Sequence, residues 1–272
     1  MTSRMSVSFV AAAMMTMSLS ASAQQAPSLI DKVIKEGILK VCVAIASPWM
    51  MKDPNGSEFV GFDVDMIKEL TKIMEVKYEL VPVPNFGQLI ASLQSGKCDV
   101  IMSALTRTTK RAMAVNFSDP YFVLGSAWVV RNEHAELNKL EDLDDPKVTI
   151  VVEQGSISEQ RTRAHMPKST VKALPVGGDA MRLTEVETGR STAASIDSLK
   201  VPAFKAQLPW AKFIPADAFE NPVEPAGLAY AVRHGDIDFV NFLNVFIFNS
   251  QGNGTIAALK AKWIDPKYIK VQ

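Results

Sequence analysis

Apolar and polar positions alternate along the first part of the chain with two different periods. Short apolar runs rich in β-branched residues are typical of buried strands, and they occur at residues 38–45, 76–83 and 99–102. Between them, apolar residues recur three or four positions apart, which predicts helices over residues 64–74 and 86–95. Asp63 is the expected N-cap of the first helix, and Gly96 ends the second. Strands that alternate with helices imply a parallel sheet covered by helices.

The same alternation begins again in the second half of the chain. Strands are predicted at residues 148–152, 192–196 and 227–233, and helices at residues 181–188 and 255–263. Residues 238–248 form a strongly apolar stretch with several aromatic side chains. Because the pattern restarts after Val130, two α/β units fit the sequence better than one, and a chain of 272 residues is long enough for both.

The N-terminal segment has the composition of a secretory signal peptide. One arginine is followed by an uncharged, mostly apolar run over residues 5–19, and Ala21 and Ala23 supply the small residues of a cleavage site. A transmembrane anchor is the alternative, but serines interrupt the run, and it is shorter than the ~20 residues that span a bilayer. We therefore expect residues 1–23 to be removed, so that the mature protein begins at Gln24 in the periplasm.

Charge and cysteine content narrow the classes of function. The chain carries 29 basic and 29 acidic residues and no long run of either sign, which argues against a nucleic-acid-binding protein with its usual basic face. Cys42 and Cys98 lie in apolar, strand-like runs, where cysteine is commonly a small buried hydrophobe. Export would permit a disulfide, but the sequence favours two buried thiols. Two cysteines without a nearby histidine give no metal-site spacing, so neither a metal nor a cofactor is expected.

Five short segments, in the right order, carry a resemblance to a known family. They are Gly61-Phe62-Asp63-Val64-Asp65, residues 89–100, the Thr-x-Thr-x-x-Arg pattern of residues 106–111, Phe117-Ser118-Asp119-Pro120-Tyr121, and Gln154-Gly155-Ser156. Each segment is a weak signal alone. Together they resemble the type II periplasmic solute-binding proteins of the polar amino-acid branch, bacterial extracellular solute-binding protein family 3. The resemblance extends over nearly all of the mature chain.

The resemblance implies a two-lobed α/β fold in which each lobe is a mainly parallel sheet flanked by helices and a two-strand hinge joins the lobes. Lobe 1 would comprise residues 24–122 and 227–272, and lobe 2 residues 123–226. Proteins of this kind close on a small solute by a hinge motion and deliver it to an inner-membrane permease of the ABC type. We therefore expect a monomeric, exported binding protein for an amino acid or similar small zwitterion, with no enzymatic activity and no nucleic-acid partner.

The resemblance also places the residues that would hold the ligand's carboxylate. Arg111 would bind it through the two parallel hydrogen bonds that a guanidinium offers; without the resemblance, Arg111 would be a surface residue. Ser103 and Thr106 follow the third strand, where ligands of open sheets bind. The alternative for this loop is that Thr106 or Thr108 caps a helix. Gly155 and Ser156 open the first helix of lobe 2, and their amides would contact the carboxylate from the other side. The alternative for that pair is a plain strand–helix turn.

Other candidates would hold the rest of the ligand. Asp197, at the end of a strand in lobe 2, would pair with the ligand's ammonium; its alternative role is N-cap of the helix that follows. Phe86 and Trp49 would line the side-chain pocket, and both could instead be core residues. Ala104 stands where some relatives carry serine, and Ala44 replaces a frequent aspartate. Because the pocket is altered at these positions, the identity of the ligand should not be copied from a relative.

An enzyme on the same fold is the main alternative. Some relatives are cyclohexadienyl dehydratases, which act on prephenate or arogenate, and fold alone does not separate an enzyme from a binding protein. Such an enzyme needs a general acid with a tuned pKa. Asp197 or Glu153 could be that acid, but nothing in the sequence marks the pKa of either as perturbed. A ligand-sensing domain of a receptor is less favoured, because no membrane or signalling segment follows Gln272.

Overall fold

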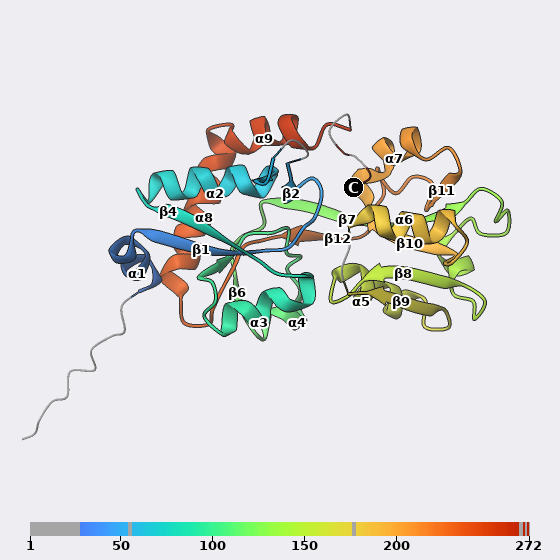
Figure 1. Ribbon diagram of the computed structural model, residues 1–272, viewed down its shortest axis with the longest axis horizontal. Coiled ribbons are helices and arrows are strands. Elements are labelled where there is room, and N and C mark those ends of the chain that lie inside the picture. Colours follow the sequence, from blue (N-terminus) through green and yellow to red (C-terminus); the bar gives the residue numbers. More distant parts are fainter. Residues whose placement is uncertain (1–27, 54–55, 176–177, 267–268, 270, 272) are drawn as a thin grey trace, which may run out of the picture.

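The computed structural model describes residues 28–53, 56–175, 178–266, 269 and 271. The signal peptide predicted over residues 1–23 lies outside these residues and stays a prediction. Within the described part of the chain, no helix is both long and apolar enough to cross a bilayer. Figure 1 shows two groups of helices and strands side by side, connected near the centre by long strands.

The first lobe is built around a five-stranded sheet. Its strand order is β4 (Lys77–Pro82), β1 (Ile38–Val43), β5 (Val100–Ile101), β13 (Ala231–Val232) and β6 (Asn116–Phe117). Strand β1 runs parallel to β4 and β5, whereas β13 runs antiparallel to β5 and β6. The predicted parallel sheet is therefore present, and the chain returns to it near the C-terminus with β13. A separate hairpin joins β2 (Met51–Lys52) to β3 (Phe59–Val60).

Helices cover both faces of this sheet. Alternate residues of β1 point to opposite sides of it, and apolar side chains on each side pack against helices. Val41 packs in one apolar cluster with α2 (Phe62–Ile73), whereas its neighbour Cys42 packs in another with α3 (Leu89–Gln94). Figure 1 shows α2 and α9 (Thr255–Trp263) on one side of the sheet and α3 and α4 (Thr109–Ala112) on the other. The other helices of this lobe are α1 (Leu29–Glu36), η1 (Phe86–Gln88) and α8 (Ile237–Gly252).

The second lobe is built around a mixed sheet. Its strand order is β11 (Ala211–Ile214), β7 (Phe122–Arg131), β10 (Ala193–Asp197), β8 (Thr149–Glu153) and β9 (Thr170–Leu174). Strands β8, β9 and β10 are parallel, and β7 runs antiparallel to β10 and β11. The helices of this lobe are η2 (Leu140–Leu143), α5 (Ile157–His165), α6 (Asp179–Glu187), η3 (Ser198–Lys200) and α7 (Val201–Gln207).

Two antiparallel strands carry the chain between the lobes. Strand β7 leaves lobe 1, and β12 (Val223–Leu228) returns beside it, with Phe122 opposite Leu228. The predicted crossing points at residues 122–123 and 226–227 lie on these strands, and the division of the chain at those positions stays a prediction. Residues 227–233, predicted as one strand, are instead the end of β12 followed by β13, which belong to different sheets.

Asp63 does not cap helix α2, and the prediction that it does is wrong. The helix begins two residues earlier than predicted, at Phe62, with Gly61 at the N-cap position, and Asp63 lies within its first turn. The fully buried carboxylate accepts hydrogen bonds from the hydroxyls of Tyr121 at 3.1 Å and Tyr230 at 3.3 Å, and from the N–H of Ala104 at 2.8 Å. Burial raises the pKa of Asp63 to about 7, although these three donors oppose the shift.

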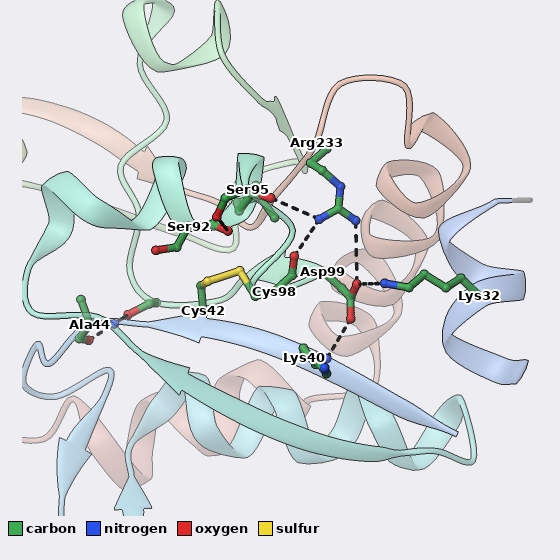
Figure 2. Close-up of a disulfide and its surroundings, with 11 residues drawn as sticks. Lys32, Lys40, Cys42, Ala44, Ser92, Ser95, Cys98, Asp99 and Arg233 are labelled. Carbon is green, nitrogen blue, oxygen red and sulfur yellow. Dashed lines mark hydrogen bonds and ion pairs between the residues drawn. A yellow bond between two sulfur atoms is a disulfide. The ribbon is translucent and has the colours of Figure 1, made fainter. Parts of the chain in front are cut away.

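The two cysteines form a disulfide, which corrects the expectation of two buried thiols. Figure 2 shows the Cys42–Cys98 bond joining β1 to the segment that precedes β5. The Cys98 carbonyl accepts a hydrogen bond from Arg233 at 2.7 Å, and the neighbouring Asp99 carboxylate pairs with Lys32 at 2.7 Å. The bond could not be read from the sequence because β1 and β5 become neighbours only in the folded sheet.

Candidate ligand-binding site

A cavity of about 750 Å³, counting the space that opens to solvent, lies between the two lobes. Segments that follow the strand ends of both sheets line it: residues 45–47 after β1, Ala104 and Thr106 after β5, and residues 156–158 after β8. Leu124 of β7 and Leu228 of β12 line it at the hinge. The position agrees with the rule that open α/β sheets bind ligands beyond the carboxyl ends of their strands.

The Arg111 side chain lies in the cavity wall and contacts both lobes. Its Nη1 donates to the carbonyl oxygen of Thr106 at 2.8 Å, and its Nη2 donates to the carbonyl oxygen of Gly155 at 3.1 Å. Burial lowers the pKa of Arg111 to about 10, and the charge of Arg161 acts in the same direction. The guanidinium is therefore cationic at neutral pH and holds its position through main-chain carbonyls rather than through a carboxylate.

The loop after β5 supplies two lining residues and one structural residue. Thr106 and Ala104 line the cavity, and Ala104 adopts a left-handed φ of 47°. The helix cap predicted as an alternative for this loop is made by Thr108, whose side chain accepts from the Arg111 amide. Ser103 is fully buried outside the cavity lining: its hydroxyl donates to the Ala44 carbonyl and accepts from the Ala44 amide, both at 2.9 Å. Ser103 thus ties the ends of β1 and β5 together.

The amides of Gly155 and Ser156 already have partners within lobe 2. The Gly155 N–H donates to the Glu159 carboxylate at 2.8 Å, and the Ser156 N–H donates to the Glu153 carbonyl at 3.2 Å. The Ser156 hydroxyl caps α5 by accepting from the Glu159 amide. Ser156 lines the cavity, whereas Gly155 is not part of the lining and its carbonyl accepts the hydrogen bond from Arg111. The local geometry of Gly155 and Ser156 is therefore that of a plain strand–helix turn, which was the alternative interpretation of this pair.

Asp197 lines the cavity and makes no capping hydrogen bond with the helix that follows it. Its carboxylate instead lies 3.3 Å from the Nζ of Lys200, and a quarter of its side chain is exposed. The alternative role of N-cap is therefore not the one that its side chain performs. Asp197 is free to face a ligand while one of its oxygens pairs with Lys200.

Four further charged residues of lobe 2 line the cavity as one connected cluster. Lys200 pairs with Asp179 at 2.7 Å, Asp179 pairs with Arg182 at 2.6 Å, and Arg182 lies 3.3 Å from Glu153. Burial alone would raise the pKa of Asp179, but Lys200 and Arg182 outweigh it and hold that pKa below its ordinary value. Burial raises the pKa of Glu153 to about 7, because the single contact with Arg182 opposes burial less effectively.

Aromatic side chains form the apolar wall on the lobe 1 side. Trp49 is fully buried and packs edge-on against Phe62, Tyr121 and Phe122, with ring centroids 4.9–6.1 Å apart. Phe86 lies at the start of η1 and is partly buried. Both Trp49 and Phe86 line the cavity, so each belongs to the core and to the pocket wall at the same time.

Comparison with known proteins identifies the family. Residues 39–266 match the sequence profile of the bacterial extracellular solute-binding proteins, family 3. The chain belongs to this family. It is 30% identical over 210 residues to the arginine-binding extracellular protein ArtP of Bacillus subtilis, covering 76% of this chain and 79% of ArtP. It is 24% identical over 254 residues to a cyclohexadienyl dehydratase of Pseudomonas aeruginosa, covering 92% and 91% of the two chains.

A solved structure shows the same fold. An ancestral amino acid-binding protein, described as a precursor of cyclohexadienyl dehydratase, superposes with a TM-score of 0.78 at 32% identity, covering 88% of this chain and all of the other. This confirms the predicted two-lobed α/β fold. The relatives include both binding proteins and an enzyme, so membership of family 3 does not by itself decide between the two functions.

Some of the residues that line the cavity of this family 3 protein were predicted and others were not. Seven of the nine predicted site residues line the cavity, namely Trp49, Phe86, Ala104, Thr106, Arg111, Ser156 and Asp197. Four further lining residues were not among the predicted site residues: Ser47, Asp179, Arg182 and Lys200. Asp179 and Arg182 are three positions apart on α6, as are Asp197 and Lys200 across η3. That spacing is usual for solvent-exposed helix pairs, and nothing local distinguishes these buried pairs from exposed ones.

Proposed function

We propose that the protein binds an amino acid between its lobes. The observation that carries this proposal is that Arg111 and Asp197, a cation from one lobe and a carboxylate from the other, line the same cavity. An amino acid presents the complementary pair of charges. A guanidinium has five N–H donors, and the bonds to Thr106 and Gly155 leave others for the ligand's carboxylate. Asp197 would accept from the ligand's ammonium.

Transport is the biological role that we propose for this binding. Family 3 membership, the relatives named as amino-acid-binding proteins and the signal-like N-terminal segment support an exported protein that delivers its ligand to an ABC-type permease. The site lies between lobes that strands β7 and β12 connect, so ligand binding and lobe closure would be coupled by a hinge motion. The closed form would be the one that the permease recognises.

A thermal-shift screen of the twenty amino acids, followed by calorimetry, tests the proposal. A ligand that binds only the folded state stabilises it by about 2.7 kcal/mol at 100 times its Kd, which raises the melting temperature measurably. For each amino acid that raises the melting temperature, the corresponding acid without the amino group should give a smaller rise, because it lacks the ammonium. If none of the amino acids shifts the transition, the proposed function is wrong.

Dehydration of prephenate or arogenate is a second candidate, which one observation favours. Glu153 lines the cavity, and its pKa of about 7 would let it donate a proton at neutral pH to a leaving hydroxyl, while decarboxylation of the ring supplies the electrons. Incubation with either substrate should produce no phenylpyruvate or phenylalanine above the uncatalysed rate if binding is the sole function. An acceleration of ~10⁶-fold or more that Glu153→Gln abolishes would establish the enzyme instead.

A further inference from the structure

The ionisable side chains that line the cavity balance in charge. Among the described residues these are three cations, Arg111, Arg182 and Lys200, and three carboxyl groups, Glu153, Asp179 and Asp197. With all six ionised, the lining carries no net charge. Burial raises the pKa of Glu153 to about 7, so protonation of this residue near neutral pH can only shift the balance toward positive charge.

This balance limits what the ligand's side chain can be. A zwitterion held by Arg111 and Asp197 adds one charge of each sign and keeps the closed cavity neutral. A cationic side chain would add a positive charge to a site whose carboxylates already have cationic partners. The Asp179 carboxylate, for example, pairs with Arg182 at 2.6 Å and with Lys200 at 2.7 Å. A buried charge without a partner is costly. The charge balance therefore disfavours a basic amino acid.

Unpartnered hydrogen-bond donors point the same way. Ser47 Oγ, Trp49 Nε1 and Arg182 Nε are buried and have no hydrogen-bond partner among the described residues. All three residues line the cavity, and their exposed fractions are 6%, 0% and 7%. Indole and guanidinium N–H groups only donate, and a hydroxyl can donate. A ligand that reaches the N–H groups of Trp49 and Arg182 must supply acceptors, and the Ser47 hydroxyl can donate to such an acceptor as well. A buried donor left without an acceptor costs free energy.

We propose that the cavity selects an amino acid whose side chain carries a hydrogen-bond acceptor and no positive charge, as an amide or a carboxylate does. This inference rests on the proposed function of amino-acid binding and deepens it. Lysine and arginine side chains fail on both counts, because they carry a positive charge and contain donors alone. On this basis the protein differs in ligand class from its relative ArtP, whose name describes arginine binding.

Matched ligand pairs test the proposal by calorimetry. L-Citrulline has nearly the shape of L-arginine but replaces the guanidinium with a neutral urea that offers a carbonyl oxygen, and L-glutamine and L-lysine form a second pair. We expect the neutral member to bind at least about tenfold more tightly in one pair or both, and the cation to win in neither. Tighter or equal binding of arginine and lysine overturns the inference but leaves amino-acid binding intact. Failure of all twenty amino acids to bind overturns the proposed function itself.

A pair of serine variants tests the role of the donors. Ser47→Ala removes a buried, unpartnered hydroxyl from the cavity lining and should weaken binding of the preferred ligand by about 3- to 10-fold, the value of one hydrogen bond. Ser191→Ala is the matched control, because the Ser191 hydroxyl is equally buried and unpartnered but Ser191 does not line the cavity. Its affinity should stay within about twofold of the parent's. Equal affinities in the two variants would overturn the proposed role of the donors.

Discussion

Arg111 and Gly155 join the two lobes directly, since the Arg111 Nη2 donates to the Gly155 carbonyl oxygen at 3.1 Å. A second link lies nearby, where the Asn85 side chain donates to the Pro175 carbonyl at 2.7 Å. Both links connect backbone of lobe 2 to side chains of lobe 1. The lobes therefore meet at the edge of the cavity, and residues at this edge should control how far they close.

Gly155→Ala should hold the lobes apart. A Cβ at this position would overlap the backbone of Gly87 in lobe 1, and the φ of 73° is unfavourable for any side chain. We expect ligand affinity to fall by at least about tenfold, and X-ray scattering with saturating ligand to show a larger radius of gyration than the parent. Gly37→Ala is the control, because its φ of 69° imposes the same backbone strain with nothing within 4 Å of the new Cβ. A Gly155→Ala variant that binds and closes like Gly37→Ala would contradict this account.

Arg111→Lys should be nearly as damaging as removal of the side chain. Lysine keeps the positive charge but cannot donate two parallel hydrogen bonds to a carboxylate, nor can it hold Thr106 and Gly155 at once as the guanidinium does. Loss of one partner from a desolvated charge pair costs about 2–5 kcal/mol, which is roughly 30- to several-thousand-fold in affinity. Calorimetry on folded variants measures it. Near-parental affinity would show that the ligand's carboxylate binds elsewhere.

Asp197→Asn tests the proposed partner of the ligand's ammonium. Because Asp197 makes no capping hydrogen bond and a quarter of its side chain is exposed, the substitution should leave the thermal stability close to that of the parent. The Lys200 ammonium keeps its contact with Asp179 at 2.7 Å, which preserves this part of the cluster. We expect amino-acid affinity to fall by about 2–5 kcal/mol, and the affinity for the matching deaminated acid to change much less. Equal losses for both ligands would remove Asp197 from the ammonium site.

Local patterns predicted the order of strands and helices, because those features depend on neighbouring residues. The family resemblance, and not these patterns, supplied the seven predicted site residues that line the cavity. The local patterns failed where distant segments meet. Asp63 looks like an N-cap until Tyr121 and Tyr230, 58 and 167 positions away, are brought to it. The cluster of Asp179 and Lys200 likewise looks like helix surface until packing buries both. Strand β7 was missed because Gly125 and Ser126 interrupt its apolar run.

Loss of the disulfide should lower stability substantially. The Cys42–Cys98 bond spans a sequence separation of 56, and in the chain-entropy account a closed loop of this length stabilises the folded state by about 4 kcal/mol. Urea unfolding of the oxidised protein and of the Cys42→Ala/Cys98→Ala variant, compared at pH 7, measures the difference. Because the bond lies outside the cavity lining, the folded variant should keep its ligand affinity. Equal unfolding midpoints with and without a reductant would show that the bond does not stabilise the protein.

The buried carboxyl group of Asp63 should make stability depend on pH in a definite direction. Its pKa is about 7 in the folded protein against an ordinary value of 3.8, so between these values the folded state holds a proton that the unfolded chain has released. The resulting stabilisation is fully present below about pH 4 and is lost as the pH rises through about 7. At ~1.4 kcal/mol per unit of pKa shift, the loss is on the order of 4 kcal/mol.

Asp63→Asn isolates this contribution, because asparagine does not titrate. Glu153, whose pKa is also raised to about 7, contributes with the same sign and remains in the variant. The free energy of unfolding, measured by urea titration from pH 4 to pH 7.5, should therefore fall more steeply with pH in the parent than in Asp63→Asn. The difference in slope does not depend on any fixed destabilisation that the substitution causes through its bonds to Tyr121 and Tyr230. Parallel curves would mean that Asp63 ionises in the folded protein as it does in the unfolded chain, with the three donors fully offsetting burial.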